Sequence, residues 1–113
     1  VRLPKKMRRE AVRSVLSRKL KDGEVVILDD FQLEQPKTRL VARLLADLQL
    51  DPADGKVLLV LAEHQPDVLR AARNIPGLFV TNVEMLNAYD LAACERLLLT
   101  RGAASRIEER YQS

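Results

Sequence analysis

The sequence contains no tryptophan, and phenylalanine and tyrosine together make up only 4% of its 113 residues. This scarcity argues against a platform of aromatic side chains for stacking the bases of single-stranded nucleic acid. The single cysteine, Cys94, cannot form an intramolecular disulfide, which is typical of a reducing compartment. No apolar run approaches the roughly 18 residues of a membrane span, and no apolar segment of a secretory signal follows the N-terminal charges. We therefore expect a soluble protein whose core is built from Leu, Val and Ala.

Phosphate-binding loops and paired histidine ligands are also missing. The four glycines stand apart from one another at Gly23, Gly55, Gly77 and Gly102, so neither common glycine-rich phosphate motif is present. The loop after the first expected strand, residues 29–33, is acidic and bulky, which argues against a bound nucleotide. His64 is the only histidine, which excludes a metal site with two His ligands.

The strongest structural signal is the stretch KVLLVLA at residues 56–62, which has six consecutive apolar residues from Val57 to Ala62. A strand with one solvated face alternates apolar and polar residues, so an unbroken run predicts a strand covered on both faces. Such a strand belongs to a parallel sheet with helices above and below it. Further short apolar segments predict strands, and the four expected strands cover residues 24–29, 56–62, 78–81 and 96–100.

Helical patterns occupy the segments between these strands. We expect helices from about residue 5 to Lys21, from Pro36 to Leu48, at 67–74, at 91–94 after a cap at Asp90, and at 102–111, with a single turn at 83–87. Parallel strands need crossover connections of roughly a dozen residues or more, and each gap is long enough. The predicted fold is one α/β domain over residues 1–113, a three-layer α/β/α sandwich with a mainly parallel four-stranded sheet and a leading basic helix.

The charge is distributed unevenly. Residues 1–21 hold nine Lys or Arg and one acid, a net charge of +8, whereas residues 22–113 hold ten basic and fifteen acidic residues, a net charge of −5. On the first helix, Lys6, Arg9, Arg13 and Ser17 share one side. Like charges so close together on one helix repel each other, and a polyanionic partner would relieve this repulsion. A solvated surface and a membrane-surface helix remain alternatives, although the apolar side, which includes Met7, is modest for a membrane and is needed to cover the sheet.

Two catalytic alternatives remain open. Asp29 and Asp30 follow the first strand, at the edge of a parallel sheet where ligands bind, and could hold Mg²⁺ in a small enzyme. They could equally be a solvated acidic pair. His64 and Cys94 could form a base and a nucleophile, or be a surface histidine and a buried structural cysteine. A third hypothesis is a protein–protein module that uses the acidic body.

Six blocks of sequence carry a resemblance over nearly the whole chain: LPKKMRREAVRSVLS (3–17), VVILDDFQLEQPKT (25–38), KVLLVL (56–61), AARNIPG (71–77), LNAYDL (86–91) and LLLTRGA (97–103). In this order and spacing they resemble the later part of the L-four family of bacterial large-subunit ribosomal proteins. The chain begins about where the family's long basic tunnel loop would return. The tunnel-lining role of that loop is therefore assigned to no residue here.

The resemblance implies a non-enzymatic protein without cofactor or metal, bound to the ribosome in the cytoplasm. It also implies as partners the large-subunit rRNA, neighbouring ribosomal proteins and, in some members, the protein's own messenger RNA. RNA binding would use phosphate contacts and recognise shape rather than sequence. The RNA-binding candidates are Arg2, Lys5, Lys6, Arg8, Arg9, Arg13, Lys37, Thr38, Arg73, Asn74 and Asn87. For Arg73, Asn74 and Asn87, local capping and loop hydrogen bonding are equally good explanations.

Overall fold

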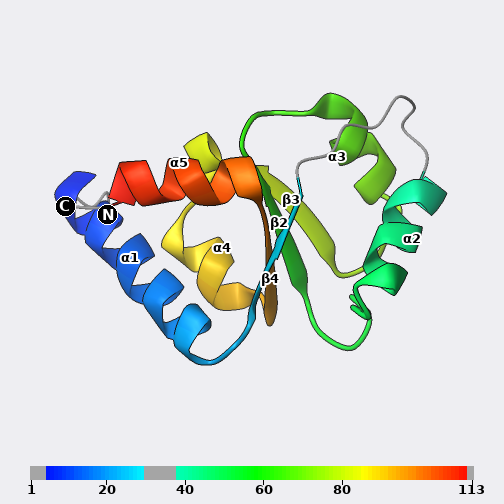
Figure 1. Ribbon diagram of the computed structural model, residues 1–113, viewed down its shortest axis with the longest axis horizontal. Helices are drawn as coiled ribbons and strands as arrows, with labels where there is room; N and C mark the ends of the chain where they lie inside the picture. Colours follow the sequence, from blue (N-terminus) through cyan, green and yellow to red (C-terminus); the bar gives the residue numbers. More distant parts are fainter. Residues whose placement is uncertain (1–4, 30–37, 112–113) are drawn as a thin grey trace.

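The structure, a computed structural model, describes residues 5–29 and 38–111, without the side chains of Lys5 and Lys6 (Figure 1). Its elements follow one another in the order α1 (Lys5–Lys21), β1 (Val25–Leu28), α2 (Thr38–Asp47), β2 (Val57–Leu61), α3 (Pro66–Ala72), β3 (Leu78–Asn82), the 3₁₀ turn η1 (Val83–Met85), α4 (Ala88–Ala93), β4 (Arg96–Thr100) and α5 (Arg101–Tyr111). The predicted alternation of strands and helices is confirmed, and most strand ends differ from the expected ones by one residue.

The four strands form one parallel sheet in the order β1-β4-β2-β3. β2 is central, and its Leu59 is in register with Val80 of β3 and Leu98 of β4. All five residues of β2 are buried, as the unbroken apolar run predicts. The expected parallel sheet of an α/β protein is therefore confirmed.

Helices cover both faces of this sheet (Figure 1). Val57, Leu59 and Leu61 of β2 belong to a core cluster with residues of α2 and α3. Leu58 and Val60, which point to the other face, belong to a cluster with residues of α1, α4 and α5. The alternation of a strand's side chains thus divides one apolar run between two cores, which explains the three layers.

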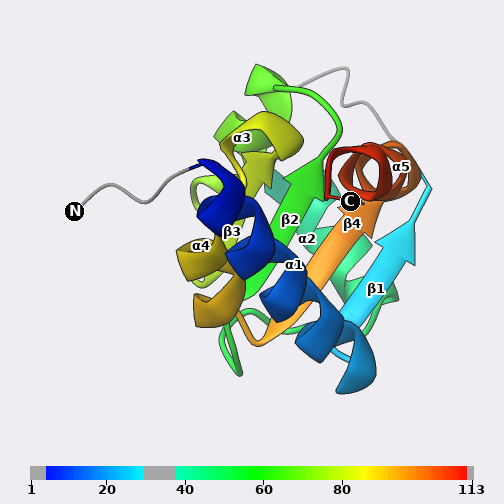
Figure 2. The same cartoon turned by 90° about the vertical axis from the view of Figure 1, so that its left-hand side faces the viewer.

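α1 packs mainly against α4 and α5, and Figure 2 shows it on the near side of the molecule, between these two helices. We expected its apolar side to cover the sheet directly, but α4 and α5 already occupy that face. Val12 and Leu16 are buried, whereas Met7 and Leu20, near the two ends of the helix, are 52% and 61% exposed. The buried stripe of α1 is therefore shorter than the sequence pattern predicts.

The ends of two helices show how local sequence sets the boundaries. α1 ends as expected at Asp22-Gly23, where Gly23 has a φ of 71° and the Glu24 amide donates to the Lys19 carbonyl. α4 begins at Ala88, not after Asp90 as predicted. The Asn87 side chain accepts a 2.9 Å hydrogen bond from the Asp90 amide, so Asn87 is the cap and Asp90 lies in the first turn.

No helix in the described part of the chain combines the length and apolar character needed to cross a bilayer.

Candidate nucleic-acid interface

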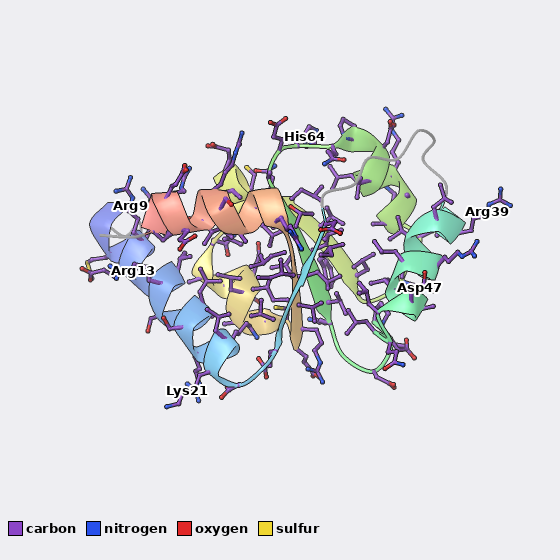
Figure 3. All side chains as sticks on the ribbon, in the orientation of Figure 1. Arg9, Arg13, Lys21, Arg39, Asp47 and His64 are labelled. Atoms are coloured by element: carbon purple, nitrogen blue, oxygen red, sulfur yellow. The ribbon has the colours of Figure 1, made fainter. Side chains whose placement is uncertain are left out.

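Cationic side chains are spread around the exposed surface of α1, and we call them together the cationic face. Its members in the described structure are Arg8, Arg9, Arg13, Arg18 and Lys21, and all five are exposed. None of them has an ion pair or a side-chain hydrogen bond with another described residue. Figure 3 shows Arg9, Arg13 and Lys21 projecting outward from the helix. The positive charge predicted for this segment is thus free for an external anion.

Arginines elsewhere in the described structure are mostly neutralised or scattered. Four of them pair with acids: Arg70 with Asp67, Arg101 with Asp29, Arg106 with Glu63, and Arg110 with Glu84. Outside α1, the described arginines without an acidic partner are scattered over three parts of the chain. They are Arg39 and Arg43 on α2, Arg73 after α3 and Arg96 on β4. Unpaired positive charge is therefore densest on α1.

Lys19 is the exception on α1, because its side chain points inward and is only 8% exposed. Its ammonium group donates to the Glu24 carboxylate at 3.0 Å and to the Cys94 carbonyl oxygen at 2.6 Å. Although Lys19 belongs to the +8 segment, its charge is paired inside the protein and contributes little to the cationic face.

A groove of about 490 Å³ lies where α1, the segment before α4 and the end of α5 meet. It brings together three of the predicted RNA-binding residues, Arg8, Arg9 and Asn87. The Asn87 amide group is already engaged, because it donates to the Asp90 carboxylate at 2.9 Å while its oxygen caps α4. Capping is therefore a role that Asn87 has in the fold, and its contact with RNA stays a prediction.

The other predicted residues are divided between separate places. Lys5 and Lys6 are in the first turn of α1, next to the cationic face, and Arg13 is one of its members. Thr38 is the first residue of α2, whereas Arg73 and Asn74 follow α3. Both helices lie on the opposite side of the sheet from α1 (Figure 1). Arg2 and Lys37 lie outside the described residues.

The residues of the catalytic alternative do not form a site. Asp29 pairs with Arg101 at 2.8 Å, with both side chains exposed, and Asp30 lies outside the described residues. His64 and Cys94 line different recesses. Cys94 is buried, and this burial raises the pKa of its thiol and disfavours the thiolate that a nucleophile needs. Among described residues, no group of three His, Cys, Asp or Glu could hold a metal.

Sequence reasoning missed Tyr89, whose ring is on the groove and 80% exposed. The low aromatic content directed attention away from it. The available signal was its position, since Tyr89 lies between Ala88 and the buried Leu91 in a helix and so faces outward. Arg110, on the same groove, was missed because its neighbours on α5 are mainly acidic.

The fold and the cationic face define an α/β domain with a concentration of unpaired positive charge on one described helix. A family model described as "Ribosomal protein L4/L1 family" matches residues 1–110. The chain belongs to this family, whose members are structural rather than enzymatic. The alternative of a small metal-dependent enzyme is therefore wrong.

Several relatives bear the name "Large ribosomal subunit protein uL4". The protein of Symbiobacterium thermophilum is 45% identical over 107 residues, which are 95% of this chain and 50% of that protein. The protein of Moorella thermoacetica is 41% identical over 108 residues, which are 96% of this chain and 51% of that protein. The chain thus spans about half the length of the curated relatives it matches, and the resemblance to the L-four family is confirmed.

Proposed function

We propose that this chain is a structural constituent of the large ribosomal subunit and that its cationic face binds rRNA. The observation that carries the proposal is the set of five exposed, unpaired cations on one described helix. The names of the relatives support the ribosome as the setting. The cytoplasmic, ribosome-bound location is part of the same proposal.

The chemistry of the face suits phosphate rather than bases. Arg and Lys side chains on a rigid helix form charge-assisted hydrogen bonds to phosphate oxygens, and each contact releases counterions from the RNA. Arg9 and Arg13 are one helical turn apart, about 6 Å along the axis, so they can follow consecutive phosphates of one strand. The binding would set the position of the domain and recognise the shape of the RNA.

A second, weaker contact is proposed for the opposite side. Thr38 at the start of α2 offers backbone amides to a phosphate, Lys37 precedes it in the sequence, and Arg73 and Asn74 follow α3. Contacts on both sides would place the domain between two RNA segments. The exposed acids of the body would then face protein neighbours, and the protein's own messenger RNA is a further candidate for the same cationic face.

The chain offers a matched pair of tests, because α1 and α2 each carry two exposed arginines four residues apart. Arg9 and Arg13 project from α1, while Arg39 and Arg43 belong to α2 at the far end of the molecule (Figure 3). We expect the double substitution Arg9→Glu with Arg13→Glu to abolish binding to an in vitro transcript of bacterial large-subunit rRNA. The substitution Arg39→Glu with Arg43→Glu changes the net charge equally and should cost much less affinity.

Circular dichroism and thermal unfolding of both variants check that the fold is intact, as expected for exposed positions. Equal losses of affinity in the two variants would mean that overall charge, not α1, governs binding. Unchanged affinity of the α1 variant would contradict the proposal outright.

A further inference from the structure

The groove beside α1 combines free positive charge with an exposed aromatic ring. Arg8 and Arg9 form part of its wall and have no acidic partner among the described residues. Among the described residues that line the groove, Glu84 is the one acid, and it is paired with Arg110 at 3.5 Å. The groove therefore keeps the positive charge of Arg8 and Arg9.

The ring of Tyr89 is unusually open for a side chain of its size. It is 80% exposed, and the neighbouring Met85 is also exposed, so water contacts an apolar patch directly beside the two arginines. Ala11 and the buried Val12 and Leu86 add to the apolar lining of the groove. A volume of about 490 Å³ lies within the range of about 300–1,000 Å³ that is usual for small-molecule sites.

The backbone that carries the ring is part of a capped helix. Asn87 caps α4 through the Asp90 amide, and Tyr89 therefore lies in the first turn of a capped helix rather than in a loose loop. Tyr89 also lines a second recess of about 300 Å³, where the Lys56 ammonium group is 5.9 Å from the centre of the Phe79 ring. Tyr89 thus lies where two recesses adjoin, one lined by Arg8 and Arg9 and the other by Lys56 and the exposed Phe79.

We propose that the groove binds an unpaired nucleotide of RNA, with its base stacked on Tyr89 and its phosphate held by Arg8 and Arg9. This inference rests on the proposed function and adds a specific class of target, a single-stranded or bulged segment. Stacking on an aromatic ring with a cation at the backbone is how proteins hold unpaired bases without reading their sequence. It departs from the expectation, based on 4% aromatic residues, that stacking plays no part.

RNA fits this groove better than a protein segment does. A docking peptide would leave two neighbouring arginines desolvated unless it supplied matching acids, whereas a nucleotide brings the phosphate with the base. The apolar lining suits the flat face of a base, and the groove continues directly from the cationic face through Arg8 and Arg9.

The test compares Tyr89→Phe with Tyr89→Leu in the 113-residue chain, measured with a transcript of bacterial large-subunit rRNA over a range of salt concentrations. Tyr89→Phe keeps the aromatic face and should bind like the unsubstituted chain. Tyr89→Leu keeps apolar volume but cannot stack, and its affinity should fall about 5- to 140-fold, which corresponds to about 1–3 kcal/mol per stacked base. The dependence of affinity on salt should not change, because no phosphate contact is lost.

A second measurement uses the tyrosine fluorescence of a chain without tryptophan. Tyr111→Phe leaves Tyr89 as the only tyrosine. A short single-stranded RNA should quench its emission, and a duplex of the same sequence should not. The Tyr89→Phe chain is the control, because its remaining Tyr111 lines the same groove but is buried and cannot stack on a base.

The outcomes separate this inference from the proposed function. If the unsubstituted chain does not bind the rRNA transcript, both are wrong. If it binds, the α1 charge-reversal variant does not, and Tyr89→Leu matches the unsubstituted chain, then only the nucleotide site is overturned. A protein neighbour would then be the better occupant of the groove.

Discussion

The ammonium group of Lys19 donates a 2.6 Å hydrogen bond to the carbonyl oxygen of Cys94, 75 residues further along the chain. Cys94 follows the last residue of α4, so the bond joins the C-terminal end of α1 to the C-terminal end of α4. A second bond of 3.0 Å joins the same ammonium group to Glu24, just before β1. One buried lysine therefore holds the cationic helix against the body of the domain.

Replacing Lys19 should weaken the fold without removing a cation from the cationic face. Lys19→Met keeps most of the volume but leaves the Cys94 carbonyl and the Glu24 carboxylate without their donor. We expect the free energy of unfolding, measured with urea, to fall by about 1–3 kcal/mol. Affinity for rRNA should be nearly unchanged under conditions in which the variant is folded.

Lys21→Met is the matched control for Lys19→Met. Lys21 is exposed and unpaired among described residues, so its loss should change stability by no more than about 0.5 kcal/mol. It should instead lower rRNA affinity and the steepness of its salt dependence. Equal stability of the two variants would show that the buried hydrogen bonds do not hold α1.

Asn87 should contribute to stability as the cap of α4. Asn87→Ala removes the acceptor for the Asp90 amide and should cost about 1 kcal/mol, whereas Asn87→Ser, which also caps well, should cost little. Urea denaturation of the two variants measures the difference. If serine destabilises as much as alanine, the side chain matters for a reason other than capping.

Two glycines with positive φ offer a test of how closely the chain packs on itself. Gly23 has a φ of 71° and an added methyl group would meet nothing within 4 Å, so Gly23→Ala should cost only about 1–2 kcal/mol for the left-handed backbone. Gly77 has a φ of 83°, and an added methyl group would also collide with the Pro52 carbonyl. Gly77→Ala should therefore be the more destabilising of the two in thermal unfolding, and the reverse order would contradict this packing.

Stability should decrease at alkaline pH in a way that depends on Cys94. Burial raises the pKa of the Cys94 thiol, although the nearby Lys19 ammonium group opposes this shift. The folded state therefore keeps the thiol proton to a higher pH than the unfolded state does. The contribution of the protonated thiol to the free energy of unfolding is fully present below the pKa of the unfolded state, about 8.5. It declines as the pH rises above this value.

The check is urea denaturation of the unsubstituted chain and of Cys94→Ala between about pH 7 and pH 10, a range that spans the ordinary cysteine pKa. Cys94→Ala should lose less stability over this range. Parallel profiles for the two chains would mean that the thiol does not contribute.

The two central strands, β2 and β4, were predictable because burial on both faces leaves a direct trace in the sequence. KVLLVLA and RLLLT have few polar positions, and both strands lie at the centre of the sheet. The placement of α1 was not predictable from its apolar pattern, because that pattern is the same whether a helix covers a sheet or two other helices. Which lysine of α1 turns inward depends on partners as distant as Cys94, and no local pattern encodes them.

The cationic face was predictable because a segment rich in Lys and Arg with a single acid can be found in the sequence without knowledge of the tertiary structure. The groove was not, since it joins Arg8 and Arg9 to residues near Tyr89 and to the end of α5. The low aromatic content also led to a wrong emphasis, because it directed the interpretation away from Tyr89. A low average number of aromatic residues says nothing about whether one of them is left exposed beside two arginines.

The strand order β1-β4-β2-β3 has a consequence for synthesis of the chain. β1 pairs only with β4, which lies between β1 and β2, so β1 has no partner in the sheet until residues 96–100 have been made. The Lys19 bond to Cys94 waits for the same late segment. The α1 segment is therefore synthesised well before the strand and the carbonyl group that hold it against the rest of the domain. The folding of the domain is thus completed by its last strand, and pairing over such sequence distances is intrinsically slow.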